Sequence, residues 1–585
     1  MGNKHGQGFD MKQIFVCLCT AMALSMAVAG NSAITPNDPD VVGNDDSESI
    51  QNAVDRAAAT GIGQVVIPAW NGRTGKTGWI LSRSILLPGN MTVVIDNAKL
   101  ALADYVYANF FRSANTWTEK GATPEGVLSN IRIIGRGFAV LHGAKANDLC
   151  EGTSRVDGRP HVRANCPILF QNVVDFEVNN LTIEDHRYWG ACFCFCRRGK
   201  ISDLHFIARY DRNNQDGINL RDGCRDITIT NISGQTGDDM IALSAIDKRR
   251  TDGYNCWVDG LSPDICHVTI DNVSGAAVGH PLIALRNHNG SRIYDIAINN
   301  VVDTPFEIPC NGMEQKRYAI IRLGNRIYWH TRRSVIGEIS RIRISGVRCS
   351  YSEEGIVVNN TLKDALFSDI YCSGPCASAV TTSGVVWGGI GATVENVTIE
   401  NATVSSDVPN SAVFDCSFIN QDDYIRNVKL RDCLLIRGGM KIEYANECIE
   451  KKYGESEAVV AALEGLEVKE GIVVLPDLEA GRKTTGYLES VPFRPGCNPV
   501  FVLGCHGRGG RVIVEVAKAS DDDGKPGKWS PFKKVSDGST VELMLGEWMK
   551  YRVTLSTSKR VSPHLHMIRF GKISHSKWIL KADSR

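Results

Sequence analysis

The stretch Val178-Asn179-Asn180-Leu181 introduces a pattern of an apolar residue, any residue, then Asn, Asp or Gly, and usually another apolar residue. The pattern returns as Ile201-Ser202-Asp203-Leu204, Ile229-Thr230-Asn231-Ile232, Ile270-Asp271-Asn272-Val273, Ile298-Asn299-Asn300-Val301, Ile344-Ser345-Gly346-Val347, Phe367-Ser368-Asp369-Ile370, Ile399-Glu400-Asn401-Ala402 and Leu430-Arg431-Asp432-Cys433. The shortest interval between copies is 23 residues, and longer intervals contain polar insertions. Such a unit has no room for a crossover helix, so the sequence predicts an all-β solenoid of the parallel β-helix type.

A helix is expected just before the repeats. Apolar residues recur at helical spacing from Ile50 to Ala58, and either Ser47 or Asp46 can cap the helix. A strand is expected at 64–68. Because a β-helix exposes apolar side chains at its ends, an amphipathic helix here would cover the first coil.

The character of the chain changes after about residue 455. We expect a short helix or linker over 457–466, followed by antiparallel strands at 500–503, 511–516, 540–543 and 550–555. The predicted domains are therefore a β-helix at 30–454 and a β-sandwich-like C-terminal domain at 455–585. Within this domain, Trp529 and Trp548 are expected to be structural rather than platforms for sugar rings.

The first residues have the pattern of an export signal. Lys4 and Lys12 precede an apolar run from Ile14 to Ala29, which ends in the small-residue sequence Ala27-Val28-Ala29. We therefore predict a signal peptide at 1–29 and export to the periplasm or the extracellular space. Since no other segment approaches the length of a transmembrane helix, no membrane span is expected.

The cysteines do not form a zinc-binding pattern. Removing the predicted leader leaves 17 of 19 cysteines, so at least one thiol has no partner within the chain. Cys192, Cys194 and Cys196 alternate along an expected strand, which places them on one face as small buried residues that cannot bridge to each other. Bridges are possible for Cys372 with Cys376, or for Cys150 with Cys166. No metal site and no cofactor are predicted.

The overall charge gives no indication of a polyanionic partner. Lys and Arg together number 65, Asp and Glu together number 65, and the formal net charge is 0. A nucleic-acid partner is therefore not expected. Hydrophobic residues make up 43% and charged residues 22%, as in an ordinary globular protein.

Three aspartates coincide with the repeat. Asp216 and Asp239 are 23 residues apart, and each lies two residues before an isoleucine that should point inward. Because neighbouring coils stack at about 4.8 Å, the two carboxylates should lie one above the other, with Asp238 beside them. Carboxylates this close raise one another's pKa, so one can act as a general acid while another acts as a base. This pair of roles is what glycoside hydrolysis needs. His280, in the next coil, could orient a carboxylate or water.

The ordered motifs Asn214-Gln215-Asp216-Gly217, Gly237-Asp238-Asp239 and Gly279-His280 resemble those of glycoside hydrolase family 28, the polygalacturonase family. The opening of the chain resembles the wider pectate-lyase-like superfamily. The resemblance implies a right-handed parallel β-helix and metal-independent hydrolysis with inversion. Asp238 would be the general acid, Asp216 and Asp239 would activate water, His280 would support the acid, and Asn214 would contact substrate.

Two departures separate this chain from the family pattern. Pro281 follows the histidine where the family usually has Gly, and the family's Arg-x-Lys motif is missing one coil later. Arg317 and Arg322 lie in that region, and either could pair with a uronate carboxylate. The hydrolytic core is thus better supported than galacturonate as the substrate. A Ca²⁺-dependent polysaccharide lyase and a non-catalytic glycan-binding β-helix stay open as alternatives to an exported hydrolase of pectin-like polysaccharide.

Overall fold

The computed structural model describes two regions of the chain. The first comprises residues 33–144, 162–209, 214–246, 255–288, 290–308, 317–324, 334–382, 392–408, 411–416, 423–437 and 440–452, and shorter stretches follow between 460 and 570. The predicted leader at 1–29 and Cys150 lie outside the described residues, so the predictions made for them remain predictions. Within the described part, no helix is long and apolar enough to cross a membrane.

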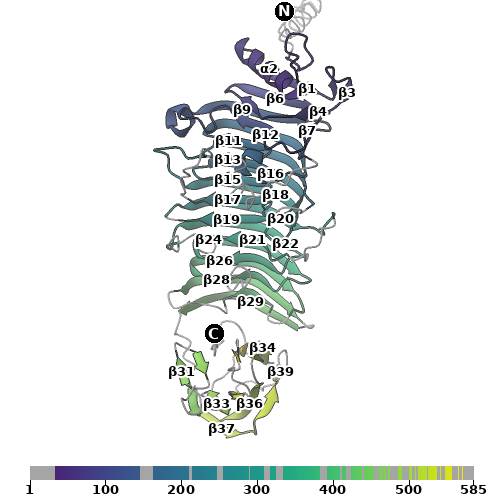
Figure 1. Cartoon of the computed structure of the whole chain (residues 1–585). Coiled ribbons are helices and arrows are strands. Elements are labelled where there is room, and N and C mark those ends of the chain that lie inside the picture. The colour runs from purple at the N-terminus through teal and green to yellow at the C-terminus, as the bar shows by residue number, and fades with distance from the viewer. Residues whose placement is uncertain are drawn as a thin grey trace, which may run out of the picture.

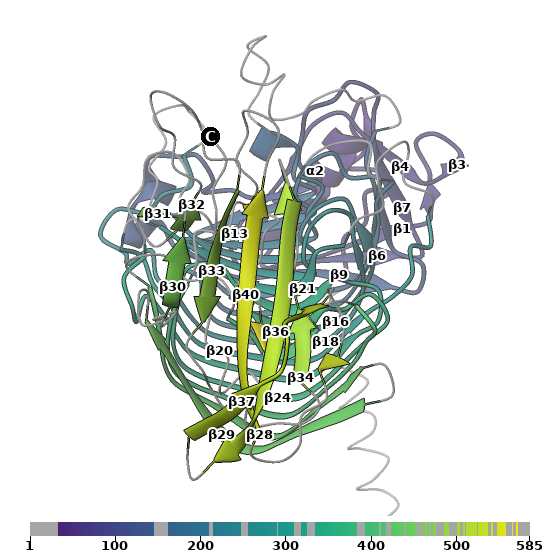
Figure 2. The same cartoon turned by 90° about the horizontal axis from the view of Figure 1, so that it is seen from below.

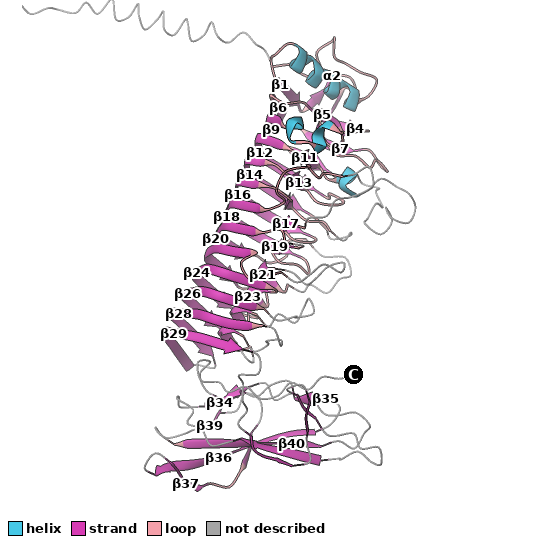
Figure 3. Cartoon of the chain, turned by 90° about the vertical axis from the view of Figure 1, so that its left-hand side faces the viewer, coloured by secondary structure: helices cyan, strands magenta, loops and turns pink. Residues whose placement is uncertain are grey.

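Between residues 64 and 437, the long and short strands that the structure describes stack as a parallel β-helix, as predicted (Figure 1). One wall is a sheet of long strands, here called sheet A: β1 (Gln64–Pro68), β6 (Met91–Asp96), β9 (Leu128–Arg136), β12 (Val173–Glu184), β14 (Arg197–Ile207), β16 (Arg225–Thr236), β18 (Ile265–Ala277), β20 (Ile293–Asp303), β22 (Ile339–Cys349), β24 (Thr361–Ser373), β26 (Thr393–Ser405) and β28 (Tyr424–Arg437). The facing wall of short strands, sheet C, comprises β5 (Ile85–Leu87), β8 (Phe111–Ser113), β11 (Ile168–Gln171), β13 (Ala191–Cys194), β15 (Ile218–Arg221), β17 (Ile241–Ala245), β19 (Ile283–Asn287), β21 (Ala319–Leu323), β23 (Glu354–Val358), β25 (Ser378–Thr381) and β27 (Ala412–Asp415). The coils stack along one axis (Figure 3).

The register of sheet A matches the repeat in the sequence at every copy. The first residues of the nine copies are direct neighbours in adjacent strands: Val178, Ile201, Ile229, Ile270, Ile298, Ile344, Phe367, Ile399 and Leu430. All nine side chains are buried in one continuous apolar core between the sheets. A shift by one residue would turn this column to the solvent, so burial fixes the register.

The third position of the pattern bends each long strand. Its residues all have left-handed backbone angles, with φ from 50° to 70°: Asn180, Asp203, Asn231, Asn272, Asn300, Gly346, Asp369, Asn401 and Asp432. Asn, Asp and Gly tolerate this conformation better than other residues. Their side chains also bond from coil to coil, as from Asn272 to Asn231 at 2.8 Å. The conformational demand at this bend explains why the repeat is visible in the sequence.

The helix expected before the repeats is α2 (Asp46–Ala59), and it covers the first coil with the buried side chains of Ile50, Val54 and Ala57 (Figure 1). The predicted cap was wrong. Asp45 caps the helix by accepting the Glu48 N–H at 2.7 Å. The side chains of Asp46 and Ser47 instead accept main-chain N–H groups of β4 (Trp79–Leu81) and of the residues directly after it, and so anchor the helix.

The parallel stack ends at β29 (Met440–Lys452), which pairs antiparallel to β28. The strands that follow are antiparallel, as predicted (Figure 2). One sheet contains β30 (Val460–Glu464), β33 (Thr485–Ser490), β40 (Trp548–Ser556), β36 (Arg511–Asp522), β37 (Lys525–Trp529) and β38 (Lys533–Val535). The short pairs are β31 (Glu467–Lys469) with β32 (Ile472–Val474), β34 (Val500–Leu503) with β39 (Thr540–Val541) and β42 (Arg569–Phe570), and β35 (Gly507–Arg508) with β41 (His564–Leu565).

Two details of the C-terminal region test what the sequence predicts for it. The prediction of a short helix or linker at 457–466 was wrong for residues 460–464, because these residues form a strand that pairs with β33. Trp529 is half-buried and Lys550 covers its ring at 4.8 Å, so this ring does not present an open stacking platform. The division at 454/455 remains a prediction, since residues 453–459 lie outside the described part.

The three alternating cysteines do not share one face. Cys192 and Cys194 point outward from β13 into a second apolar cluster, whereas Cys196 lies in the inner core. The expected alternation breaks at Phe195, whose left-handed backbone, with φ of 52°, turns the chain after β13, so that Cys196 enters the inner core.

Candidate active site

The four predicted catalytic residues meet at the start of three neighbouring sheet C strands. Ile218 of β15 pairs with Ile241 of β17, and Ile241 pairs with Ile283 of β19. Asp216 and Asp239 precede the first two isoleucines by two residues each, so they occupy equivalent positions in adjacent coils. The Gly217 N–H donates to the Asp239 main-chain carbonyl at 3.0 Å, which continues the ladder up to the aspartates.

Two glycines make this approach possible. A Cβ on Gly217 would lie 2.4 Å from the Met240 carbonyl oxygen, so a larger residue after Asp216 would push the two coils apart. Gly279 has φ of 67°, a left-handed conformation that places His280 after the end of the preceding strand.

Asp238 is paired with His280. The Asp238 Oδ1 lies 2.8 Å from the His280 Nδ1 and accepts the Asp239 N–H at 2.8 Å. Burial alone would raise the pKa of Asp238, but His280, and after it Arg286 and the Asp239 N–H, bring this pKa below its usual value. The side chain of Asp238 is 12% exposed, against 3% for Asp216 and 0% for Asp239. Asp238 is therefore the carboxylate of the three that a bound molecule can reach.

Asp239 is held by two arginines from the following coils. The Arg286 Nη2 of β19 donates to its Oδ2 at 2.6 Å, and the Arg322 Nη2 of β21 lies 3.6 Å from its Oδ1. Arg286 also lies 3.9 Å from the Asp216 Oδ2. Both arginines occupy outward positions of sheet C, since their neighbours Leu285 and Leu323 belong to the inner core.

Asp216 has the opposite electrostatic setting from Asp238. Burial, followed by the charges of Asp238 and Asp239, raises the pKa of Asp216 well above its usual value, although Arg286 and Asn219 partly counter this. The Asn219 Nδ2 donates to its Oδ2 at 3.0 Å, and a ring nitrogen of the buried His186 lies 2.8 Å from its main-chain oxygen. The site thus holds adjacent carboxyls with pKa values driven in opposite directions.

The predicted substrate-contacting residues are only partly brought together. Arg322 lies in the site, as described. Arg317 does not pair with the aspartates in the contacts seen here: its guanidinium lies 3.7 Å from the centre of the Phe306 ring and also donates to the Thr304 carbonyl. Asn214 has a left-handed backbone with φ of 63°, two residues before Asp216.

Sequence reasoning missed Arg286, Asn219 and His186. A signal for Arg286 and Asn219 exists: each alternates with inward apolar residues on a strand that begins just after a predicted catalytic residue. His186 acts through a main-chain oxygen, and a sequence carries no signal for that contact.

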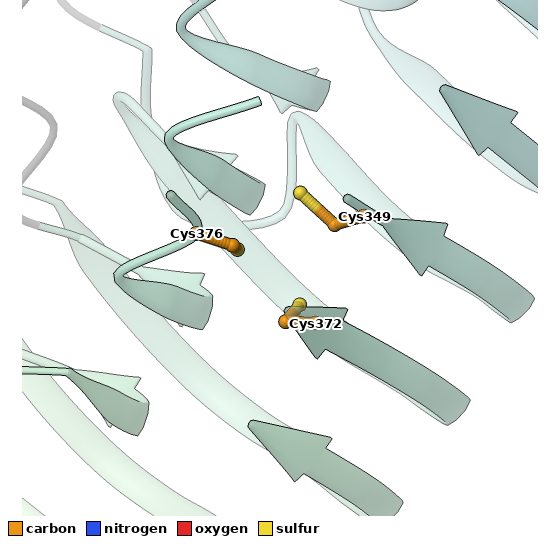
Figure 4. Close-up of side chains that lie close together, drawn as sticks. All are labelled: Cys349, Cys372 and Cys376. Carbon is orange, nitrogen blue, oxygen red and sulfur yellow. The ribbon is translucent and has the colours of Figure 1, made fainter. Parts of the chain in front are cut away.

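Two groups among the described residues bring three possible metal ligands within 4.8 Å of one another. One is Asp238, Asp239 and His280, where two guanidiniums already neutralise the carboxylates and oppose a hard cation such as Ca²⁺. The other is Cys349, Cys372 and Cys376, inside the core (Figure 4). Each of these thiols donates to a main-chain carbonyl, and the Cys376 Sγ, for example, lies 3.3 Å from the Ser378 oxygen.

No protein-family model matches the chain, and no curated protein matches it. Among solved structures, it is similar to an exopolygalacturonase from Thermotoga maritima, with 12% identity, a TM-score of 0.43 and coverage of 72% of this chain and 95% of the other. It is also similar to a mannuronan C-5 epimerase module from Azotobacter vinelandii, with 13% identity, a TM-score of 0.42 and coverage of 69% and 95%. A third is the tailspike of the E. coli bacteriophage HK620, with 10% identity, a TM-score of 0.42 and coverage of 92% and 94%. Likenesses at this level assign no activity to this chain.

Proposed function

We propose that this protein is an exported glycoside hydrolase that cleaves pectin-like or related polysaccharides by an inverting acid/base mechanism, in the manner of glycoside hydrolase family 28. The observation that carries the proposal is the arrangement of Asp216, Asp238 and Asp239 in adjacent coils, with the pKa of Asp216 raised and that of Asp238 lowered. Carboxyls with separated pKa values are suited to divide acid and base roles.

Asp238 is the proposed general acid because it is the most exposed of the three and has His280 at 2.8 Å. Despite its burial, the pKa of Asp238 is lowered by its neighbours His280, Arg286 and the Asp239 N–H, so its carboxyl is ionised in the resting site. A bound sugar excludes water from the site and disfavours the ionised carboxyl, so Asp238 takes up a proton from solvent as the substrate binds. Asp238 then donates it to the leaving oxygen. Geometry has priority over the resting pKa in this choice.

Asp239 is the proposed base that takes a proton from the attacking water, and protonated Asp216 orients that water. Arg286 covers both carboxyls in the resting site. A substrate carboxylate would attract Arg286 and Arg322 as charge-assisted donors and so release Asp239 for the reaction. This role for the arginines favours an acidic sugar in the substrate.

The test compares the wild type with Asp238→Asn on a panel of pectic and other plant polysaccharides. New reducing ends and ultraviolet-absorbing unsaturated products are measured, with and without a chelator. The matched control is Asp203→Asn, which replaces an aspartate on the opposite sheet where φ of 57° also suits Asn. We expect saturated products that resist the chelator, are retained in Asp203→Asn and fall about 10²–10⁴-fold in Asp238→Asn.

Other outcomes would reject the hydrolase. Unsaturated products that require a divalent cation would identify a polysaccharide lyase. Binding of the same glycans with no product from the wild type would identify a glycan-binding protein.

A further inference from the structure

Four thiols form a row on the outside of sheet C, next to the candidate site. Cys192 and Cys194 point outward from β13, and Cys166 and Cys256 come from two segments that cover this face. All four are thiols in this structure and are at most 3% exposed. The row is a small cluster of its own, separate from the inner core.

The contacts within the row give it an order. The Sγ atoms of Cys192 and Cys194 lie 3.8 Å apart. Cys166 lies close enough to Cys192 to raise its pKa, and Cys256 lies close enough to Cys194 to act on its pKa in turn. The middle pair belongs to one extended strand, where residues two apart are about 6.6 Å from each other and their Cβ atoms point the same way. That geometry does not suit a disulfide. The two outer pairs, by contrast, each join separate segments of the chain.

The surroundings favour bridges over a metal. Among the described residues, the groups with three ligand atoms within 4.8 Å of one another do not include these four thiols, so the row is too extended for a compact tetrathiolate site. Aromatic residues line the cluster, among them Trp189, and Trp257 packs edge-on against Phe195 at 5.1 Å. The guanidiniums of Arg163 and Arg221 lie 5.6 and 4.8 Å from the centre of the Trp189 ring, so the enclosed cluster is aromatic and carries positive charge at its edge. A disulfide adds no further charge to it.

The triangle of Cys349, Cys372 and Cys376 provides a contrast (Figure 4). Its thiols donate to the main-chain carbonyls of Ser352 and Ser378, so they are satisfied in the reduced form. The thiols of the triangle also contact one another, so it differs from the outer row in these bonds to main-chain carbonyls and in its number of thiols. An odd number of thiols in the triangle also leaves one unbridged in any state, whereas the row divides into two pairs.

We propose that Cys166–Cys192 and Cys194–Cys256 are disulfides that fasten two covering segments to the outer wall of the β-helix. Each bridge forms when two thiols lose two protons and two electrons to the disulfide of a thiol oxidoreductase, or to glutathione disulfide, which is reduced to the dithiol or to two thiols. Cys192 and Cys194 are the direct neighbours of Asn219 and Arg221 in β15. Since Asn219 holds Asp216, the bridges stiffen the wall that carries the candidate site.

Burial raises the pKa of Cys192 well above its usual value, and contact with Cys192 raises the pKa of Cys194. Thiols of this kind react slowly because the thiolate is the reactive form. The bridges should therefore form during folding and resist mild reductants afterwards.

The test is peptide mapping of the full chain. The protein is refolded in glutathione buffer, alkylated in denaturant and digested without reduction, and the cross-linked peptides are identified by mass spectrometry. We expect Cys166 linked to Cys192 and Cys194 linked to Cys256. Four alkylated thiols, or a link between Cys192 and Cys194, would overturn the proposal.

A second measurement does not depend on the mapping. Unfolding in the presence of a strong reductant should lower Tm by several degrees in the wild type. The double variant Cys194→Ser/Cys256→Ser should lose part of this shift, whereas Cys448→Ser, at an exposed cysteine, should keep all of it. If the double variant does not fold, the wild-type map alone decides. If the reductant lowers the Tm of the double variant as much as that of the wild type, the Cys194–Cys256 bridge is contradicted.

Discussion

The two walls of the β-helix belong to the same coils but differ in which of their positions repeat from one coil to the next. The long strands of sheet A repeat one backbone bend, with a left-handed Asn, Asp or Gly in each of nine coils. The short strands of sheet C keep only their inward apolar residues in register, and their outward positions carry Cys192, Asn219, Ala242, Ala284 and Arg322 in successive strands. A wall without a conformational requirement at its outward positions can change its chemistry from coil to coil, so the candidate site lies there.

The largest contrast between the walls should come from one aspartate on each. Asp239→Asn in the site is expected to lower kcat by about 10²–10⁴-fold, because the proposed base is lost. Asp369→Asn in sheet A should leave kcat unchanged, since Asn accepts φ of 55° and can still accept the bond from Asn401. Kinetics on the substrate identified above, corrected for the folded fraction, check both. Equal losses in the two variants would mean that the effect is structural.

A substitution in the buried column of sheet A should lower the stability of the protein and leave its activity intact. Ile270 is fully buried at the centre of the sheet A column. Ile270→Ala removes packed methyl groups and leaves a cavity, so we expect a loss of about 2–5 kcal/mol in the free energy of unfolding. Activity per folded molecule should remain, because the column lies opposite the site. Denaturant unfolding and kinetics at low denaturant measure the two quantities, and a stability within about 0.5 kcal/mol of the wild type would show that the coil can collapse around the gap.

The sequence predicted the features that a repeated physical requirement produces. The register of sheet A was predictable because each copy combines a buried residue with a left-handed bend. The neighbouring positions of Asp216 and Asp239 were predictable because each has the same offset from an inward isoleucine.

Features that depend on single tertiary contacts were not predictable. Asp45, Asp46 and Ser47 can all cap a helix, and only the contacts of the last two with the chain around β4 leave Asp45 for that role. The strand at 460–464 forms because β33 is available to pair with it. Arg286 resembles any outward arginine until the coil of Asp239 is placed beside it.

The electrostatic part of the contrast can be tested through pH. The folded protein keeps Asp216 protonated at pH values where the unfolded chain has ionised it, because its folded pKa is raised. Its contribution to stability is therefore fully present below the unfolded pKa of about 3.9 and is lost as pH rises toward the folded pKa. Asp216→Asn removes this loss and can keep the acceptor for Asn219. Thermal unfolding of both proteins from pH 4 to pH 8 should show the variant gaining relative stability as pH rises, and a difference that is constant with pH would contradict the raised pKa.

The smallest expected effect concerns the bend itself. Asn272 has φ of 57° and donates to Asn231 at 2.8 Å on the surface of sheet A. Asn272→Ala should cost about 1 kcal/mol, because alanine resists the left-handed conformation. Asn272→Gly loses the same side-chain bond but adopts this conformation freely, so it should be the more stable of the two variants. Because both variants lack the side-chain bond to Asn231, the difference between their free energies of unfolding measures the backbone cost alone. If alanine and glycine are equally destabilising in denaturant unfolding, the side-chain ladder determines the repeat, and the recurrence of Asn and Asp at this position would reflect their hydrogen bonds instead of the bend.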